Sequence, residues 1–205
     1  MKERKIGASW FIVQGYCEYK LYLQKVLGLE LPKTQEMMLG SEIHENKEKE
    51  FLEKAKEGTW EDFLKAEELT ITKEVFFEQK IGDIILLGKV DEIAIDKDSI
   101  TIIDDKPRAF PYNGTKNQLL AYCYLFKEQF KPLQKKLSAA LRNRDTNQIV
   151  WEQEFDKSSE EQFFTTFHRL RNVLLEKEEP VPTTNKNKCQ ACQFNQMCKF
   201  SLVQE

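Results

Sequence analysis

The chain lacks three features that would each point to a particular class of protein. It has no apolar run of the roughly 20 residues that a membrane-spanning helix needs. It has no excess of basic residues, because 31 Lys and Arg face 34 Asp and Glu, so any contact with nucleic acid must be local. It also shows no internal repeat. Gln14 and Glu18 interrupt the apolar residues near the N-terminus, so no signal peptide is predicted and we expect a cytoplasmic protein with no membrane partner.

The length and the apolar content favour one compact domain. A chain of 205 residues with 40% hydrophobic residues can bury a sizeable core. We expect a single domain over 1–205, with a core at about 34–155. The flanking parts are a helix at 9–28 and a C-terminal region at 156–205.

Hydrophobic periodicity predicts a mixed arrangement of helices and strands. The 3.6-residue period favours helices, whereas alternating or β-branched runs favour strands. Helices are expected at about 9–28, 34–56, 61–67, 113–129 and 158–177, and strands at about 69–79, 84–95, 99–106, 136–141 and 148–155. This order predicts an α/β (α+β) fold, with a small mixed central sheet flanked by helices.

Cysteine is the scarce residue with the most informative placement. Cys189, Cys192 and Cys198 form a C-x₂-C-x₅-C motif, and Cys17 lies near the other end of the chain. An odd total of five cysteines argues against a simple disulfide framework, and cytoplasmic clusters more often bind metal. Four thiolates suit both a [4Fe–4S] cluster and structural zinc, and spacing alone leaves both open. Cys123 is expected to be a buried small apolar residue.

A group of acidic and basic residues lies on two neighbouring predicted strands. Side chains alternate along a strand, so Asp104 and Lys106 point the same way, about 7 Å apart. A hairpin would place Asp91 beside Asp104. Carboxylates are preferred ligands of Mg²⁺, and a nitrogen ligand from His44 would suit Mn²⁺ better. These residues therefore predict metal-assisted phosphodiester cleavage.

Two more residues extend this pattern and give it a family resemblance. Gln118 and Tyr122 share one helix face at positions i and i+4. His44, Gly88-x₂-Asp91, Asp104-x-Lys106 and Gln118-x₃-Tyr122, in this order, resemble the RecB-type branch of the PD-(D/E)XK nuclease superfamily. With Cys17 and the C-terminal cysteine motif, nearly the whole chain resembles the Cas-four family of CRISPR-associated exonucleases. The chain has Pro107 and Glu18 where that family has other residues more often.

The resemblance implies a role for each matching residue. The metal ligands would be His44, Asp91, Asp104 and the backbone carbonyl of Asp105. The catalytic lysine would be Lys106, and the site would be supported, or DNA contacted, by Gln118 and Tyr122. The [4Fe–4S] cluster would be bound by Cys17, Cys189, Cys192 and Cys198. The metal would be Mn²⁺ or Mg²⁺. The resemblance also favours iron–sulfur over zinc.

The same resemblance implies a substrate and partners. Members of the family trim single-stranded DNA ends and help to prepare new spacers for the CRISPR integrase, the complex of Cas-one and Cas-two. A homo-oligomer is compatible with this role. For DNA contacts we expect the loop that follows the lysine, through Arg108, Tyr112 and Lys116. Further candidates for phosphate contacts are Arg142, Arg144, Arg169 and Arg171.

Three other functions share much of this pattern. A subunit that recognises a DNA end or its adjacent PAM sequence would keep the fold and have little catalysis. A RecB-like or AddB-like repair nuclease would share every motif, and gene neighbourhood would separate it. A zinc-stapled adaptor without catalysis would be colourless. The intact Asp91, Asp104 and Lys106 favour an enzyme.

Overall fold

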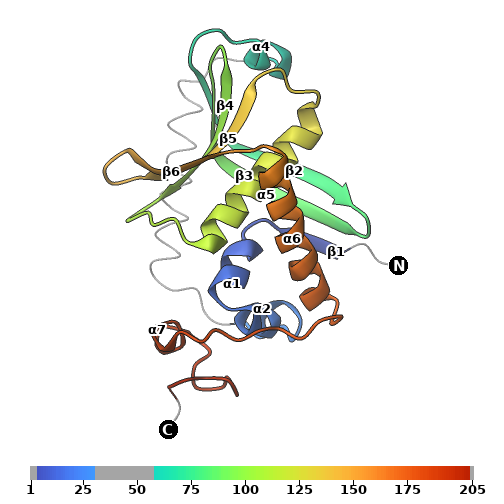
Figure 1. The fold of residues 1–205 in the computed structure, drawn as a ribbon, viewed down its shortest axis with the longest axis vertical. Coiled ribbons are helices and arrows are strands. Elements are labelled where there is room, and N and C mark those ends of the chain that lie inside the picture. The colour runs from blue at the N-terminus through green and yellow to red at the C-terminus, as the bar shows by residue number, and fades with distance from the viewer. Residues whose placement is uncertain (1–3, 31–57, 204–205) are drawn as a thin grey trace.

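The computed structural model describes residues 4–30 and 58–203. Within these residues six strands form one mixed sheet, and helices pack on it (Figure 1). The elements in chain order are β1 (Arg4–Gly7), α1 (Trp10–Tyr16), α2 (Glu18–Lys25), α4 (Trp60–Leu64), β2 (Thr70–Ile81), β3 (Ile84–Ile95), β4 (Ser99–Lys106), α5 (Asn113–Phe130), β5 (Lys136–Asn143), β6 (Gln148–Glu154), α6 (Lys157–Leu174) and α7 (Lys186–Gln190). The predicted class, a mixed sheet flanked by helices, is confirmed.

The sheet forks along β3. Antiparallel β2 pairs with β3 from Ile84 to Val90 and from Glu92 to Ile95, and the register skips Asp91. The other edge of β3 is therefore shared: parallel β1 pairs with Ile84–Leu87, and antiparallel β4 pairs with Glu92–Ile95. Residues 88–91 lie between these two stretches, where β1 and β4 diverge. Strand β4 then pairs in parallel with β5, and β5 pairs antiparallel with β6.

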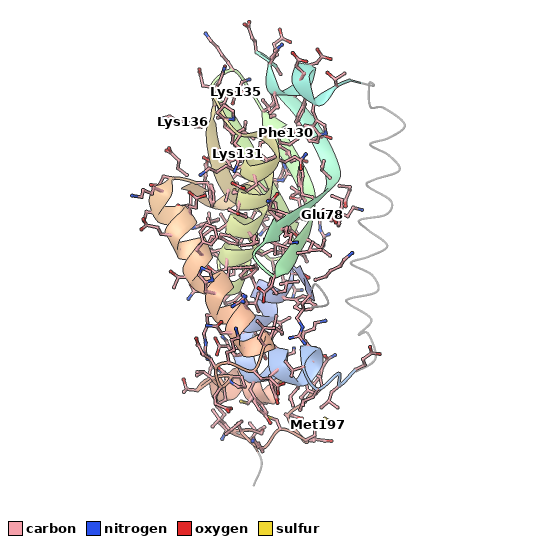
Figure 2. All side chains as sticks on the ribbon, turned by 90° about the vertical axis from the view of Figure 1, so that its right-hand side faces the viewer. Glu78, Phe130, Lys131, Lys135, Lys136 and Met197 are labelled. Atoms are coloured by element: carbon pink, nitrogen blue, oxygen red, sulfur yellow. The ribbon has the colours of Figure 1, made fainter. Side chains whose placement is uncertain are left out.

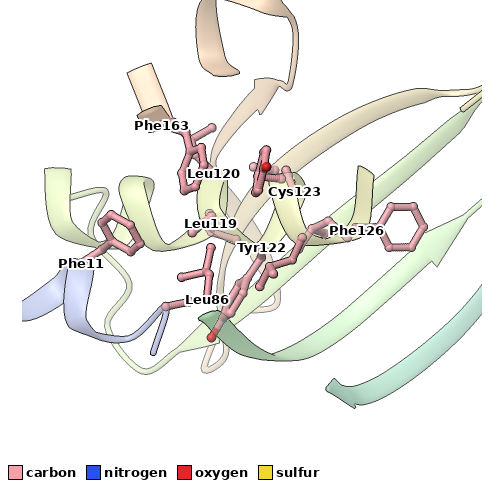
Figure 3. Packing of buried hydrophobic residues seen from close by; sticks show 14 of the residues in the cluster. Phe11, Leu86, Leu119, Leu120, Tyr122, Cys123, Phe126 and Phe163 are labelled. Atoms are coloured by element: carbon pink, nitrogen blue, oxygen red, sulfur yellow. The ribbon is translucent and has the colours of Figure 1, made fainter. Parts of the chain in front are cut away.

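Helix α5 is the centre of the core. It is buried on every side between Leu119 and Phe126, because the sheet lies against one face and α1 and α6 against the others. Figure 3 shows Leu119, Leu120 and Phe126 of α5 packed among Leu86 of β3, Phe11 of α1 and Phe163 of α6. Each large side chain buried here contributes roughly 1.5–3 kcal/mol, so this layer holds the sheet and the helices together.

Two glycines set the distance between α1 and α5. A Cβ atom on Gly15 would lie 2.6 Å from the backbone of Gly114. A Cβ atom on Gly114 would lie 2.9 Å from the backbone of Ile12. Only glycine at both positions lets the two helices approach this closely. The first turn of α5 is thereby held against α1.

The C-terminal tail lies at one end of an elongated molecule. Helices α2 and α7 lie there with it, next to α1, whereas β1 lies nearer the middle (Figure 1). In Figure 2, Met197 of the tail lies at the end opposite Lys135 and Lys136. The expected single helix at 9–28 is wrong in one respect, because an extended Cys17 (φ −169°) divides it into α1 and α2. The break turns the chain so that the Cys17 sulfur accepts a hydrogen bond from the Thr183 backbone N–H at 3.4 Å.

Most of the other expected elements agree with the structure. The strands predicted at 84–95 and 99–106 have those bounds, and the central and last long helices differ from expectation by a few residues. Strand β1 was not predicted, because its pairing with β3 is a long-range contact of a short charged segment. The helix expected at 34–56, which includes His44, lies outside the described residues. None of the helices in 4–30 and 58–203 has the length and apolar character needed to cross a membrane.

Candidate active site

Asp104 and Lys106 project from the end of β4 and contact each other. Lys106 Nζ lies 2.8 Å from Asp104 Oδ1. Asp104 is buried, whereas Lys106 keeps part of its side chain in solvent. The two side chains therefore meet as the alternation along a strand predicts. Lys106 supplies a positive partner that reaches from the buried carboxylate to the surface.

Asp91 lies at the fork in β3, next to this pair. Its Oδ2 accepts a hydrogen bond from the Asp105 backbone N–H at 3.1 Å. The pKa of Asp104 is raised to about 6, mainly by burial; Lys106 opposes this rise and the Asp91 carboxyl adds to it. Two neighbouring carboxyl groups, one of them buried, are best neutralised together by a bound cation.

Tyr122 of α5 lies near both carboxylates, and Gln118 contacts its hydroxyl group. Gln118 Nε2 donates a hydrogen bond to the Tyr122 hydroxyl at 2.8 Å, as expected for residues at i and i+4. The pKa of Tyr122 is raised well above its ordinary value, first by burial and then by the negative charges of Asp104 and Asp91. The hydroxyl group of Tyr122 is therefore neutral, and it faces the acidic pair.

Gly88 makes room for this tyrosine. In Figure 3 the Tyr122 ring extends from α5 towards the sheet. A Cβ atom on Gly88 would lie 2.8 Å from the Tyr122 ring and 2.7 Å from Leu125 Cδ1. The glycine three residues before Asp91 is therefore explained by packing, since any side chain would push Tyr122 away from the carboxylates.

Two buried oxygen atoms at the site lack a hydrogen-bond donor. Among the described residues, no group donates to Asp104 Oδ2 or to Gln118 Oε1. A buried acceptor without a partner costs about 1–3 kcal/mol, so such atoms are usually satisfied by a ligand, a water or an ion. An unpaired carboxylate oxygen beside a second carboxylate fits a hard divalent cation.

Behind the site, Arg142 of β5 binds two carboxylates that the sequence did not connect with it. Its Nη1 and Nη2 lie 2.8 and 3.0 Å from the oxygens of Glu92, and its Nε and Nη2 lie 2.7 and 3.0 Å from those of Asp105. Both acids raise the pKa of Arg142, Asp105 first. Arg142 was expected to contact phosphate, but in the structure it joins β3, β4 and β5. Nothing in the local sequence signals this role, because it arises from the pairing of Asp105 with Arg142 in the sheet.

Two other arginines expected at phosphate are also engaged with carboxylates. Arg171 makes two hydrogen bonds to Asp83, both 2.8 Å long. Arg169 binds Glu18 through Nε at 3.0 Å and also contacts Glu178. These arginines lie on α6, and each one joins distant segments of the chain. Structural ion pairs therefore explain both.

The loop between β4 and α5 remains open to solvent. Arg108 and Tyr112 are exposed, and Lys116 Nζ lies 5.5 Å from the centre of the Trp151 ring. Arg144 lies close enough to Lys106 for its charge to lower the pKa of that lysine. The pKa of Lys106 is nevertheless raised, because the neighbouring carboxylates outweigh burial and Arg144. Of the basic groups expected to contact DNA, Arg144 therefore lies near the carboxylate site.

The four cysteines predicted to bind a metal centre line one cavity. Cys17 from the break between α1 and α2 and three cysteines from the C-terminal segment line its wall. Its wall is completed by Phe194, which is fully buried, and by Tyr16, whose hydroxyl donates to the Lys188 carbonyl. Within 4–30 and 58–203, no three His, Cys, Asp or Glu side chains are arranged to hold one metal ion. Cys123 is fully buried elsewhere, as expected.

Comparison with known proteins gives the class of the protein. The family model of the PD-(D/E)XK nuclease superfamily matches residues 45–199, which is most of the chain. The chain therefore belongs to the PD-(D/E)XK nuclease superfamily, whose members generally use divalent metal ions. This supports the identification of the protein as a nuclease.

Solved structures share the fold at low sequence identity. One is a crystal structure from Eubacterium rectale named "Putative exonuclease", with 12% identity and a TM-score of 0.54, covering 99% of this chain and 90% of the other. Another is that of SSO0001, with 18% identity and a TM-score of 0.50, covering 99% and 90%. Identities this low establish the fold alone. No curated protein matches the chain in sequence.

Proposed function

We propose that the protein is a divalent-metal-dependent exonuclease that acts on single-stranded DNA ends. The observation that carries this proposal is the buried Asp104, which lies beside Asp91 and Lys106 and whose Oδ2 has no donor in the part of the chain that the structure describes. A site of this composition provides oxygen ligands for a cation and a positive group for a phosphate. Within a nuclease superfamily, those are the parts that phosphodiester hydrolysis requires.

The residues present fit a cation at this position. Asp91, Asp104 and the backbone carbonyl of Asp105 would hold Mn²⁺ or Mg²⁺, and His44, which lies outside the described residues, would add a nitrogen ligand. When bound, the ion polarises the phosphate and lowers the pKa of the attacking water. Lys106 would donate hydrogen bonds to the scissile phosphate and orient that water.

Tyr122 and Gln118 act on the carboxylates from the other side. Both are buried over the acidic pair, and their mutual hydrogen bond keeps the Tyr122 ring in place. They exclude bulk water from Asp104, which strengthens every electrostatic interaction at the site. Gln118 Oε1 has no donor among the described residues and is available to a water or a substrate group.

The activity is tested with end-labelled single-stranded DNA in Mn²⁺ or Mg²⁺. We expect digestion by the wild type, loss of it in Lys106→Ala, and no change in Lys97→Ala, which alters an exposed lysine in the β3–β4 turn. Circular single-stranded DNA should resist an exonuclease because it has no ends. Cleavage that persists in Lys106→Ala, or equal cleavage of linear and circular DNA, would contradict the proposal.

We also propose that Cys17, Cys189, Cys192 and Cys198 bind a [4Fe–4S] cluster. All four line one cavity, which brings together the residues that the resemblance assigns to a cluster, and four thiolates are the usual ligand set of [4Fe–4S]. Anaerobic purification should give a brown protein containing iron, and Cys17→Ser should lose the colour and iron together. A colourless protein that contains zinc would refute this part.

We further propose that the nuclease prepares DNA ends for the Cas-one and Cas-two integrase. The support is the order of the nuclease motifs combined with the cysteine cavity. Mixing the protein with the purified integrase and a DNA bearing single-stranded overhangs should give a complex and trimmed, integrated ends. Stimulation of integration that survives Lys106→Ala would instead favour an end-recognition subunit. Trimming without any contact with the integrase would favour a repair nuclease.

A further inference from the structure

Two exposed aromatic side chains lie close in sequence to Lys106 of the carboxylate site. Phe110 is 60% exposed and Tyr112 is 64% exposed, although both lie in the short loop that follows Lys106. Their ring centres are 4.6 Å apart, and the ring planes are tilted by 45°. Apolar side chains grouped on a surface mark places where a ligand or a partner binds.

The loop holds this pair in a fixed conformation. Pro111 lies between the two aromatic residues, and the Tyr112 N–H donates to the Phe110 carbonyl at 2.8 Å across it. Tyr112 is also the N-cap residue of α5, a helix packed firmly in the core. At the other side, the Arg108 N–H donates to Asp145 Oδ2 at 3.3 Å, and Arg108 has a left-handed backbone (φ 49°). A platform that is already ordered loses little entropy when it binds.

The surroundings of the pair favour an anionic ligand. Residues 106–116 include Lys106, Arg108 and Lys116 and no acidic residue. Among the described residues, one side-chain carboxylate accepts a hydrogen bond from the backbone of 106–116. It is that of Asp145, which accepts from the Arg108 N–H. Phe110 is four residues from Lys106, so their Cα atoms are at most about 14 Å apart. A stacked strand in a duplex advances roughly 3.4 Å per nucleotide, so that distance spans at most about four nucleotides.

We propose that Phe110 and Tyr112 form a stacking platform for the bases of a single-stranded DNA end, a few nucleotides from the bond that is cut. This inference rests on the proposed nuclease function and assigns the substrate form to the same site. Bases in a duplex are already paired and stacked, so the platform selects unpaired strands. It reads no sequence, because every base has an aromatic face. The neighbouring basic residues hold the phosphates.

The test compares DNA with and without bases on an otherwise unchanged strand. The full-length protein carries Lys106→Ala so that binding is measured without cleavage. One oligonucleotide is ordinary, and a second has abasic sites at its last few nucleotides, which removes the bases and keeps the phosphates. The Phe110→Ala/Tyr112→Ala variant is compared with Phe76→Ala, which removes a similarly exposed ring (59%) on β2. Dissociation constants are measured by fluorescence anisotropy.

We expect the double variant to bind the ordinary strand at least about tenfold more weakly. It should bind the abasic strand as the parent protein does, and Phe76→Ala should change neither. A variant that carries both Phe110→Tyr and Tyr112→Phe should bind the ordinary strand as tightly as the parent protein, because both aromatic rings remain. This pattern would support stacking, since loss of fold or of charge would weaken both strands alike.

Other outcomes would overturn the inference. Equal weakening on both strands would assign the effect to general damage, and no weakening on either would show that the rings do not contact bases. Unchanged DNA binding with an altered oligomeric state on size-exclusion chromatography would assign the pair to a protein contact. Cleavage by the protein with Lys106 intact is measured separately. If cleavage is absent while the base-dependent binding is present, the proposed exonuclease fails and the stacking platform stands.

Discussion

Replacing Arg142 should be the most damaging single change behind the active site. The guanidinium group makes four hydrogen bonds to Glu92 and Asp105. The exposed fraction of the side chain is 17% for Arg142, 5% for Glu92 and 10% for Asp105. Arg142→Ala leaves two carboxylates without this partner. Breaking a buried ion pair from one side costs about 3–5 kcal/mol. Since a domain is stable by roughly 5–15 kcal/mol, this is a large fraction of the total.

The loss is measured by urea unfolding followed by circular dichroism, from the midpoint and slope of the transition. A second variant, Glu92→Gln, removes one of the charges that Arg142 neutralises. If the two residues act as a unit, the double variant should lose less stability than the sum of the single variants, by about 1–3 kcal/mol. Arg142→Lys should fall between the wild type and Arg142→Ala, because one ammonium cannot make all four hydrogen bonds.

Arg171→Ala is the matched control. Arg171 also makes two hydrogen bonds to one carboxylate, that of Asp83, but these side chains are 23% and 35% exposed. Solvent screens such pairs, and their contribution is usually below about 1 kcal/mol. Arg142→Ala should therefore lose several times more stability than Arg171→Ala. Equal losses would refute the reasoning, because they would mean that burial does not distinguish the two arginines.

Three further changes test the front of the site. Gly88→Ala should destabilise the protein by about 1–3 kcal/mol and lower kcat, because the added Cβ displaces Tyr122; urea unfolding and DNA digestion measure the two effects. Tyr122→Phe should cost about 1–3 kcal/mol by leaving the buried Gln118 Nε2 without its acceptor, which the same unfolding assay detects. Burial raises the pKa of Asp104 to about 6, so without metal the folded chain keeps a proton that the unfolded chain loses above about pH 4. The free energy of unfolding should then fall by on the order of 3 kcal/mol as the pH rises from about 4 to 6. Asp104→Asn should abolish this fall in a series of thermal melts at different pH values. The affinity for Mn²⁺ should rise as the pH passes 6.

Local periodicity was sufficient to predict that Asp104 lies next to Lys106 and that Gln118 lies next to Tyr122. The β-branched runs at 84–95 and 99–106 gave strands with the observed bounds, and alternation placed Asp104 and Lys106 on one side. Helical spacing placed Gln118 next to Tyr122, which the structure joins by a hydrogen bond. Each of these relations spans few residues, so it depends on backbone geometry that the local sequence determines.

Relations that depend on strand pairing were beyond such patterns. Arg142 lies 50 residues from Glu92 and 37 from Asp105, and it reaches them only because β5 pairs in parallel with β4. The short strand β1 is defined in the same way by its position beside β3. The break at Cys17 is also non-local, because the residues around it have a helical pattern and its contact partner is Thr183. Sequence could suggest that Arg142 binds an anion, but not which anion.

The two faces of β4 explain why a cation would bind at the front of the site and not behind it. Successive residues point to opposite sides of a strand, so Asp104 and Asp105 are separated although they are adjacent in sequence. Behind the sheet, Arg142 binds both Asp105 and Glu92, and Lys73 Nζ lies 3.2 Å from Glu92 Oε2, so two positive groups balance the two carboxylates there. In front, Lys106 contacts one oxygen of Asp104 and the other oxygen has no donor among the described residues. The remaining negative charge is thus confined to the side that faces Tyr122, and a divalent ion there would neutralise it without competing with Arg142.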